Sequence, residues 1–174
     1  MTTEQWIVPA SRGELVITRA TPADVDALTA IYEETERWQI ARGIDPGLPP
    51  MPLRLIVARR VENGSIYLAR VGGAPAGTVT LAWDDRIVWP DAPEGDAGYV
   101  HGLAVARAFA GRQIGLAILR WVEGYVAGLG KPFVRLDCNG DNPALRAYYV
   151  RAGYTHRGDV SVGRLASRYE KRVG

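Results

Sequence analysis

The sequence predicts a single α/β domain with a mixed, mostly antiparallel central sheet and helices on both faces. Apolar residues alternate between strand-like and helix-like spacing, in the order β-α-α-β-β-β-α-β-α-β-β. The order combines hairpins with two crossover connections, and this combination is typical of a mixed sheet. A chain of 174 residues is long enough for one domain with a substantial core.

Composition excludes several classes of function. Hydrophobic residues make up 47% and charged residues 23%, as in ordinary globular proteins, and the net charge of +2 does not favour nucleic acid or an anionic membrane. No window is long and apolar enough for a membrane span, and the N-terminus lacks a signal pattern, so a cytoplasmic location is expected. Cys138 is the one cysteine, which excludes an intrachain disulfide, and no metal site is expected.

The N-terminal part is predicted to hold an arm, a strand and a helix. Residues 1–13 lack periodicity and are expected to be an arm, ordered only if Trp6 and Ile7 find a surface, which leaves residues 14–174 for the domain. Residues 15–19 have the β-propensity of a strand. A helix starts next, with Thr21 as N-cap and Pro22 at the first helical position.

The remaining elements follow from periodicity and turn residues. Residues 42–52 form a loop rich in glycine and proline, and residues 53–62 a second helix. Gly72-Gly73 is typical of the turn of a β-hairpin. The other predicted strands cover residues 65–71, 74–83, 99–105, 131–138, 154–162 and 166–173, with further helices after Gly115 and over residues 143–152.

The stretch over residues 99–115 combines a strand, a glycine turn and the start of an amphipathic helix. The first amide groups of a helix have no partner within it, and the helix dipole places partial positive charge there. This arrangement favours the binding of a phosphate group.

A likeness to a known family rests on two motifs. The first is Ala-Gly-Arg-Gln-Ile-Gly at residues 110–115; the second is Asn142, Tyr149, Gly153 and Tyr154 on and after the next helix. A glycine turn before a helix is a weak signal by itself, but the two motifs are correctly spaced along a matching order of elements. On these grounds residues 15–173 resemble the GNAT superfamily of N-acetyltransferases, whose pyrophosphate loop has the form Gln/Arg-x-x-Gly-x-Gly/Ala.

Two positions of the loop depart from the family pattern. Ala110 stands where Gln or Arg is usual, and Gln113 stands where glycine is usual. We expect Gln113 to lie in the first turn of the helix, where its backbone suits a side chain and its N–H still faces the ligand. Gly111 and Gly115 remain, and Arg112 supplies positive charge.

The resemblance implies acetyl-CoA as co-substrate. Backbone N–H groups of the loop would hold its pyrophosphate, and main-chain groups of the preceding strand would pair with its pantetheine arm. Asn142 would contact pantetheine in addition to capping its helix. The residues expected to bind the cofactor are therefore Leu103, Ala104, Val105, Ala110, Gly111, Arg112, Gln113, Ile114, Gly115 and Asn142.

Tyr149 matches the general acid of the family, which protonates the departing thiolate. It follows Asn142 by seven residues, so the two side chains share one face of the helix. Tyr148 points about 100° away, and we expect it to join the core together with Leu145 and Ala152.

His101 is the leading candidate for the general base, because an imidazole has an unperturbed pKa of about 6.5. Strand alternation places Tyr99, His101 and Leu103 on one face, barring a bulge. The family often uses a carboxylate in this region, so Asp137 and Asp96 are rivals.

The acceptor is expected to bind near the polar loop over residues 84–96. Trp83, Asp84 and Asp85 lie at the start of this loop and would suit a cationic amine through ion pairing and cation–π contact. A solvated surface loop is the structural alternative.

The sequence therefore indicates an acetyl-CoA-dependent N-acetyltransferase acting on a small-molecule amine by direct transfer. A non-catalytic acyl-CoA sensor or partner-binding module of the same fold is the alternative. The oligomeric state is left open, with a homodimer as one option.

Overall fold

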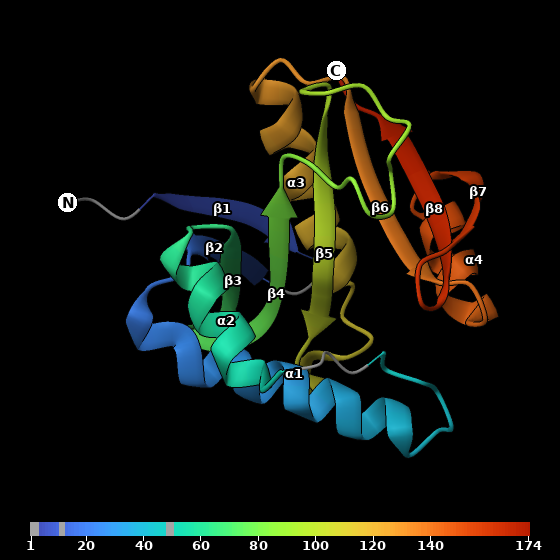
Figure 1. Cartoon of the computed structure of the whole chain (residues 1–174). Coiled ribbons are helices and arrows are strands. Elements are labelled where there is room, and N and C mark those ends of the chain that lie inside the picture. Colours follow the sequence, from blue (N-terminus) through green and yellow to red (C-terminus); the bar gives the residue numbers. More distant parts are fainter. Residues whose placement is uncertain (1–3, 11–12, 48–50) are drawn as a thin grey trace. The chain divides into compact units, whose positions relative to one another are not determined.

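The computed structural model describes residues 4–10, 13–47 and 51–174. Residues 1–3 and 11–12 of the expected arm, and residues 48–50 of the expected 42–52 loop, lie outside the described part (Figure 1). The strands are β1 (Gln5–Ala10), β2 (Gly13–Arg19), β3 (Ile66–Val71), β4 (Ala74–Ala82), β5 (Ala97–Val105), β6 (Phe133–Asn139), β7 (Thr155–Ser161) and β8 (Leu165–Arg172). The helices are α1 (Val25–Ile40), α2 (Leu53–Glu62), α3 (Ile114–Gly128) and α4 (Pro143–Arg151), with 3₁₀ turns at Pro22–Asp24 and Arg107–Phe109.

The described strands form a mixed sheet in the order β1-β2-β3-β4-β5-β6-β8-β7. β5 and β6 are parallel, whereas β1–β2, β2–β3, β3–β4, β6–β8 and β7–β8 are antiparallel. The predicted α/β class with a mixed, mostly antiparallel sheet is confirmed. The chain divides into two compact units, one of residues 1–80 and 102–121 and the other of residues 81–101 and 122–174.

The first unit has helices on both faces of its strands. α1 and α2 pack on one face, with Leu28 and Val57 in a buried cluster that includes Leu68 of β3 (Figure 1). Tyr67, the neighbour of Leu68 along β3, meets Trp121 of α3 at 4.9 Å between ring centroids. Because successive side chains of a strand point to opposite faces, α3 covers the face opposite to α1 and α2.

Residues 5–10 of the expected arm form β1, which pairs antiparallel with β2. Trp6 finds a surface, with its ring 6.0 Å from Tyr67 and 5.2 Å from Trp121 between centroids. Ile7 points the other way and stays 60% exposed. This alternation of apolar residues is too short to show as a period in the sequence.

In the second unit, β5 passes between α3 and the 84–96 loop. A Cβ at Gly98 would lie 2.5 Å from Val126 of α3, so a side chain there would force the strand and helix apart. Tyr99 points to the opposite face and meets Trp89 of the loop at 6.5 Å between ring centroids. α4 supplies Tyr149, which packs against Tyr169 of β8.

Gly102 interrupts the regular alternation of β5. Its φ is +54°, and its carbonyl accepts a 2.7 Å hydrogen bond from the Tyr32 hydroxyl. The predicted common face of His101 and Leu103 therefore does not follow, because that prediction required a regular strand through residue 102.

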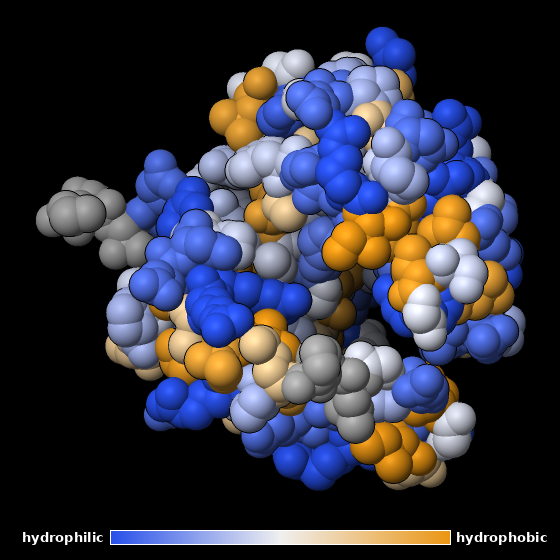
Figure 2. Space-filling view, in the orientation of Figure 1, coloured by the Kyte–Doolittle hydropathy of each residue, from blue (hydrophilic) through white to orange (hydrophobic). Residues whose placement is uncertain are grey.

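Exposed large hydrophobic side chains are scattered over several elements of the described chain. Ile87, Ile40 and Val150 are each more than half exposed and come from a loop and two different helices. Figure 2 shows separate hydrophobic patches among hydrophilic side chains on one face. Single exposed apolar residues are normal and define no interface by themselves. None of the described helices is long and apolar enough to span a membrane.

Candidate active site

The glycine turn before α3 has the strand–turn–helix form that the sequence predicted. β5 ends at Val105, the 3₁₀ turn covers Arg107–Phe109, and α3 begins at Ile114. Gly111 has a φ of +75°, a conformation that glycine adopts without steric cost. The turn therefore places the start of α3, with its first amide groups, next to an exposed glycine.

Gln113 differs from the prediction. It precedes α3 rather than lying in its first turn, and its φ of +58° makes it the one described non-glycine residue with a positive φ. Its carbonyl accepts the Ala117 N–H at 3.0 Å, so it caps the helix from a left-handed conformation. For a residue with a Cβ this conformation costs about 1–2 kcal/mol. Gln113 thus adopts a backbone conformation that glycine would reach without this cost.

The turn has room for an anionic group. Gly111, Arg112 and Gln113 are exposed, and a Cβ at Gly111 would meet no atom within 4 Å. The Arg112 guanidinium lies 5.2 Å from the centre of the Phe109 ring. A phosphate group therefore fits the open glycine, the amides of a helix start and one nearby cation.

Of the other expected cofactor residues, Leu103, Ala104 and Val105 form the last residues of β5 in the first unit. The next amide, that of Ala106, donates to the Ala76 carbonyl at 2.9 Å. Asn142 belongs to the second unit and is an N-cap, because its Oδ1 accepts the Leu145 N–H at 3.1 Å. Its side-chain NH₂ group is the part of the amide left for a ligand.

Tyr149 is buried, and Tyr148 is only half-buried, which reverses the expected assignment of the core position. The Tyr149 ring lies 5.8 Å from Tyr169 and 6.1 Å from Tyr154, between centroids. Burial, with a contribution from nearby Cys138, raises the pKa of the Tyr149 phenol well above its ordinary value. The phenol therefore keeps its proton throughout the neutral range.

His101 lies beside two carboxylates. Its Nε2 is 3.7 Å from Asp85 Oδ2, and one ligand atom each from His101, Asp85 and Asp137 lies within 4.8 Å of the others. The Asp85 and Asp137 side chains are only 8% and 5% exposed. Asp85 Oδ1 accepts the Val88 N–H at 3.0 Å, and Asp137 Oδ2 accepts from Arg164 at 2.5 Å. Both carboxylates are therefore held in place beside the imidazole.

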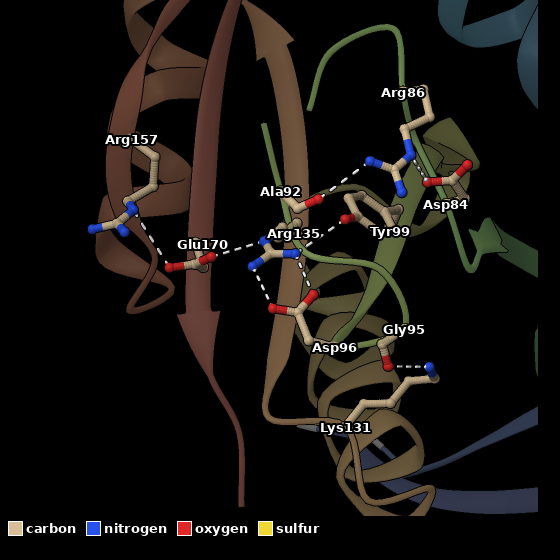
Figure 3. Close-up of polar contacts among 10 residues, drawn as sticks. All are labelled: Asp84, Arg86, Ala92, Gly95, Asp96, Tyr99, Lys131, Arg135, Arg157 and Glu170. Carbon is tan, nitrogen blue, oxygen red and sulfur yellow. Dashed lines mark hydrogen bonds and ion pairs between the residues drawn. The ribbon is translucent and has the colours of Figure 1, made fainter. Parts of the chain in front are cut away.

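Asp96, the second rival for the base, is not in this cluster. Both of its oxygens bind Arg135, at 2.6 and 2.9 Å, and Arg135 also binds Glu170 and the Tyr99 hydroxyl (Figure 3). Burial opposes the charge of Arg135, but the bonds with Asp96 and Glu170 outweigh it and raise the pKa of the guanidinium. Asp96 is therefore a structural partner of a buried arginine.

The start of the 84–96 loop is divided between two environments. Asp84 pairs with Arg86 at 3.0 Å, and Arg86 also binds the Ala92 carbonyl (Figure 3). Trp83 is 41% exposed, and the Lys131 ammonium lies 5.4 Å from its ring centre. In the described part of the chain, Asp85 is the one of the three expected acceptor-binding residues that is seen to contact His101.

Cys138 is buried, as expected for a core residue. Burial, together with nearby Asp137, raises the pKa of its thiol to about 11.

Comparison with known families gives the class of protein. The model of the acetyltransferase (GNAT) family matches residues 26–154, and the chain belongs to this family. It is an N-acetyltransferase with acetyl-CoA as its acetyl donor, as the resemblance implied.

Individual relatives agree with this assignment. An uncharacterized N-acetyltransferase of Bacillus subtilis, YesJ, is 30% identical over 147 residues, which cover 80% of this chain and 81% of YesJ. A GNAT-family acetyltransferase of Listeria monocytogenes has a solved structure with a TM-score of 0.83, 26% identity, and coverage of 97% and 100% of the two chains. An acetyltransferase of Salmonella typhimurium, described as modifying the N-terminal serine of ribosomal protein L7/L12, has the same fold, with a TM-score of 0.70, 19% identity and coverage of 97% and 100%.

Three cationic partners were missed by sequence reasoning. Arg164 engages Asp137, and Arg135 and Arg168 engage carboxylates of the 84–96 loop. The sequence held one signal for these pairs. Arg135 and Asp137 share a face of β6, as Tyr99 and His101 share a face of the neighbouring strand β5. The residues opposite to them on β8, namely Glu170 and Arg168, follow from the register alone.

Proposed function

We propose that the protein transfers the acetyl group of acetyl-CoA directly to the primary amine of a small molecule, with His101 as general base and Tyr149 as general acid. The observation that carries this proposal is His101 beside two nearly buried carboxylates. In the reaction, the amine nitrogen bonds to the thioester carbonyl carbon and the carbon–sulfur bond breaks. The nitrogen loses a proton to the base, and the sulfur gains one from the acid.

The surroundings of the three candidates support His101 as general base rather than Asp137 or Asp96. Asp137 is engaged by Arg164, and Asp96 by Arg135. An imidazole changes its charge near neutral pH, as a base for an amine must. Asp85 would stabilise the imidazolium that forms when His101 takes up the proton.

A phenol is protonated throughout the neutral range and can donate its proton to the departing thiolate, which supports Tyr149 as the acid. Its position seven residues after the N-cap Asn142 matches the family motif.

Main-chain groups of residues 103–105 and 110–115 of the first unit would hold the acetyl donor. The open space at Gly111 and the helix start at Ile114 suit its pyrophosphate. When bound, acetyl-CoA supplies the activated thioester.

The partial burial of His101 supports a slender acceptor. Its side chain is 31% exposed, so an unbranched primary amine reaches the imidazole more easily than a bulky one. Asp85 would bind the cationic form of such an amine, whereas Asp84 is occupied by Arg86 and Trp83 packs against Tyr125 of α3.

The acceptor class is tested by following thiol release from acetyl-CoA with two panels. One contains primary alkylamines and amino-acid derivatives, and the other contains peptides with free N-termini and no lysine. We expect turnover with members of the first panel. Turnover with peptides alone would contradict the small-molecule acceptor, and acetyl-CoA binding without turnover on either panel would favour the non-catalytic alternative.

Gly111→Asp should weaken acetyl-CoA binding, measured by calorimetry, by about tenfold or more, because it sets a carboxylate against phosphate charge. Gly111→Asn is the matched control: both side chains tolerate positive φ, but asparagine carries no charge. Equal affinities for the two variants would show that phosphate does not bind at this glycine.

Tyr149→Phe should lower kcat by about 10²- to 10⁴-fold with little change in acetyl-CoA affinity, because it removes only the proton donor. Tyr148→Phe, at the neighbouring and less buried ring, should keep the parent rate. An unchanged kcat in Tyr149→Phe, with chemistry shown to be rate-limiting, would make Tyr149 a packing residue.

His101→Ala should abolish the acidic limb of the pH–rate profile. Only neutral imidazole accepts a proton, so the parent rate should rise with pH through one ionisation, and the variant should lose most activity below neutrality. At high pH, where the amine is already neutral, the variant should approach the parent rate. His156→Ala, at the only other histidine, is the control and should keep the limb. A His101→Ala profile parallel to that of the parent, with a lower Tm, would assign His101 a structural role.

A further inference from the structure

The 84–96 loop is fixed to the sheet of the second unit by two arginines. Arg135 of β6 holds the end of the loop through its two bonds with Asp96 (Figure 3). Its guanidinium carbon also lies 5.4 Å from the centre of the Trp89 ring. Arg135 is itself held by Glu170 and the Tyr99 hydroxyl, so this end of the loop is tied to β5, β6 and β8 together.

Arg168 of β8 holds the middle of the loop. Its Nη1 donates to Asp91 Oδ1 at 2.8 Å, and its guanidinium carbon lies 5.1 Å from the Trp89 ring centre. Its Nη2 donates to the Arg157 carbonyl at 3.1 Å, which fixes the orientation of the guanidinium. Trp89 therefore contacts both guanidiniums, and it is only 5% exposed. We call Arg135 and Arg168 the arginine clamp.

The charges around the arginine clamp balance within the second unit. Three guanidiniums, of Arg135, Arg157 and Arg168, meet three carboxylates. These are Asp91, Asp96 and Glu170. A pocket of about 300 Å³ beside the clamp is lined by these residues except Asp96, so its charges are already matched by internal partners. The clamp therefore requires no charged ligand, and its evident effect is on the loop.

A short turn connects the arginine clamp to Asp85. The Trp89 N–H donates to the Asp85 carbonyl at 2.9 Å, and the Val88 N–H donates to Asp85 Oδ1 at 3.0 Å. The carbonyl of Asp85 is thus bonded to Trp89, and its carboxylate to Val88. A shift of Trp89 would move the Asp85 carboxylate relative to His101.

We propose that Arg168 is a positioning residue: acting through Trp89 and Asp91, it holds Asp85 against His101. The catalytic part of this inference rests on the proposed role of His101 as base. Its structural part, the placement of the 85–89 turn by Arg168, does not.

The first test is a double-mutant cycle with Arg168→Met and Asp85→Asn. Arg168→Met should lower kcat/KM up to about 100-fold, as misplacement by about 1 Å can do. In the Asp85→Asn background the same substitution should cause little further loss, because Arg168 acts through Asp85. Equal losses in both backgrounds, or no loss in either, would overturn the proposal.

Two controls separate positioning from general stability. Glu94→Gln breaks the exposed pair of the same loop with Arg86 and should leave the rate and the Tm unchanged. Arg168→Lys keeps the charge that pairs with Asp91 but loses the planar group over Trp89, so it should recover part of the rate. If Arg168→Met does not fold, Asp91→Asn removes the same ion pair from the loop side and replaces it in the cycle.

The pH–rate profile supplies a readout that lost stability would not move. Asp85 and Asp137 face His101, and Arg164 offsets one of them. If the Asp85 carboxylate moves away, the His101 imidazolium loses a neighbouring negative charge that stabilises it. The acidic limb of Arg168→Met should therefore move to lower pH. An unmoved limb alongside a reduced rate would assign Arg168 to folding alone.

Hydrogen exchange at the Val88 amide tests the structural part independently of activity. This amide is bonded to Asp85 Oδ1, so it should exchange faster in Arg168→Met and at the parent rate in Glu94→Gln. If His101→Ala and Asp85→Asn retain full activity, the proposed base fails, whereas faster Val88 exchange would still support the placement of the turn. Unchanged exchange would overturn that placement.

Discussion

The buried guanidinium of Arg135 is the contact on which the second unit depends. Its side chain is only 5% exposed, and removing such a charge from water costs several kcal/mol unless it is fully paired. The compensating groups come from three segments: Asp96 from the 84–96 loop, Tyr99 from β5 and Glu170 from β8. Loss of one partner of a buried pair costs about 3–5 kcal/mol, so these segments are bound to fold as a set.

The carboxylates of the 84–96 loop have different tasks because the strands beneath them present different cations. Asp91 and Asp96 meet arginines, which are permanently charged, and both serve to attach the loop. Asp85 meets His101, the proposed general base, so the same type of side chain would belong to an acid–base system there. The residue opposite, rather than the loop sequence, decides which role each carboxylate has.

Local rules predicted most of the fold, and tertiary contacts account for what they missed. Pro143 and the N-cap Asn142 place the start of α4 correctly, because caps depend on neighbouring backbone only, whereas Pro22 begins a 3₁₀ turn and α1 follows at Val25. β1 was missed because its order comes from β2 and from aromatic partners far away in the sequence.

The candidate site divides in the same way. Its motifs fixed the glycine turn and the helix of Tyr149, but helical spacing could not show that Tyr154 and Tyr169 bury the Tyr149 ring. The left-handed backbone of Gln113 was also out of reach, since side chains rarely adopt it and propensity argued against it. The pairing of His101 with Asp85 required a loop conformation set by arginines on two other strands.

The burial of Cys138 determines how the protein meets thiol reagents. It is the only cysteine in the chain, and with a thiol pKa of about 11 it is almost entirely protonated near neutral pH. Disulfide reagents and alkylating agents attack the thiolate, and they would also have to reach a side chain enclosed by the second unit. Coenzyme A released in solution is therefore far more reactive than the protein itself, and the chain resists oxidative cross-linking between copies.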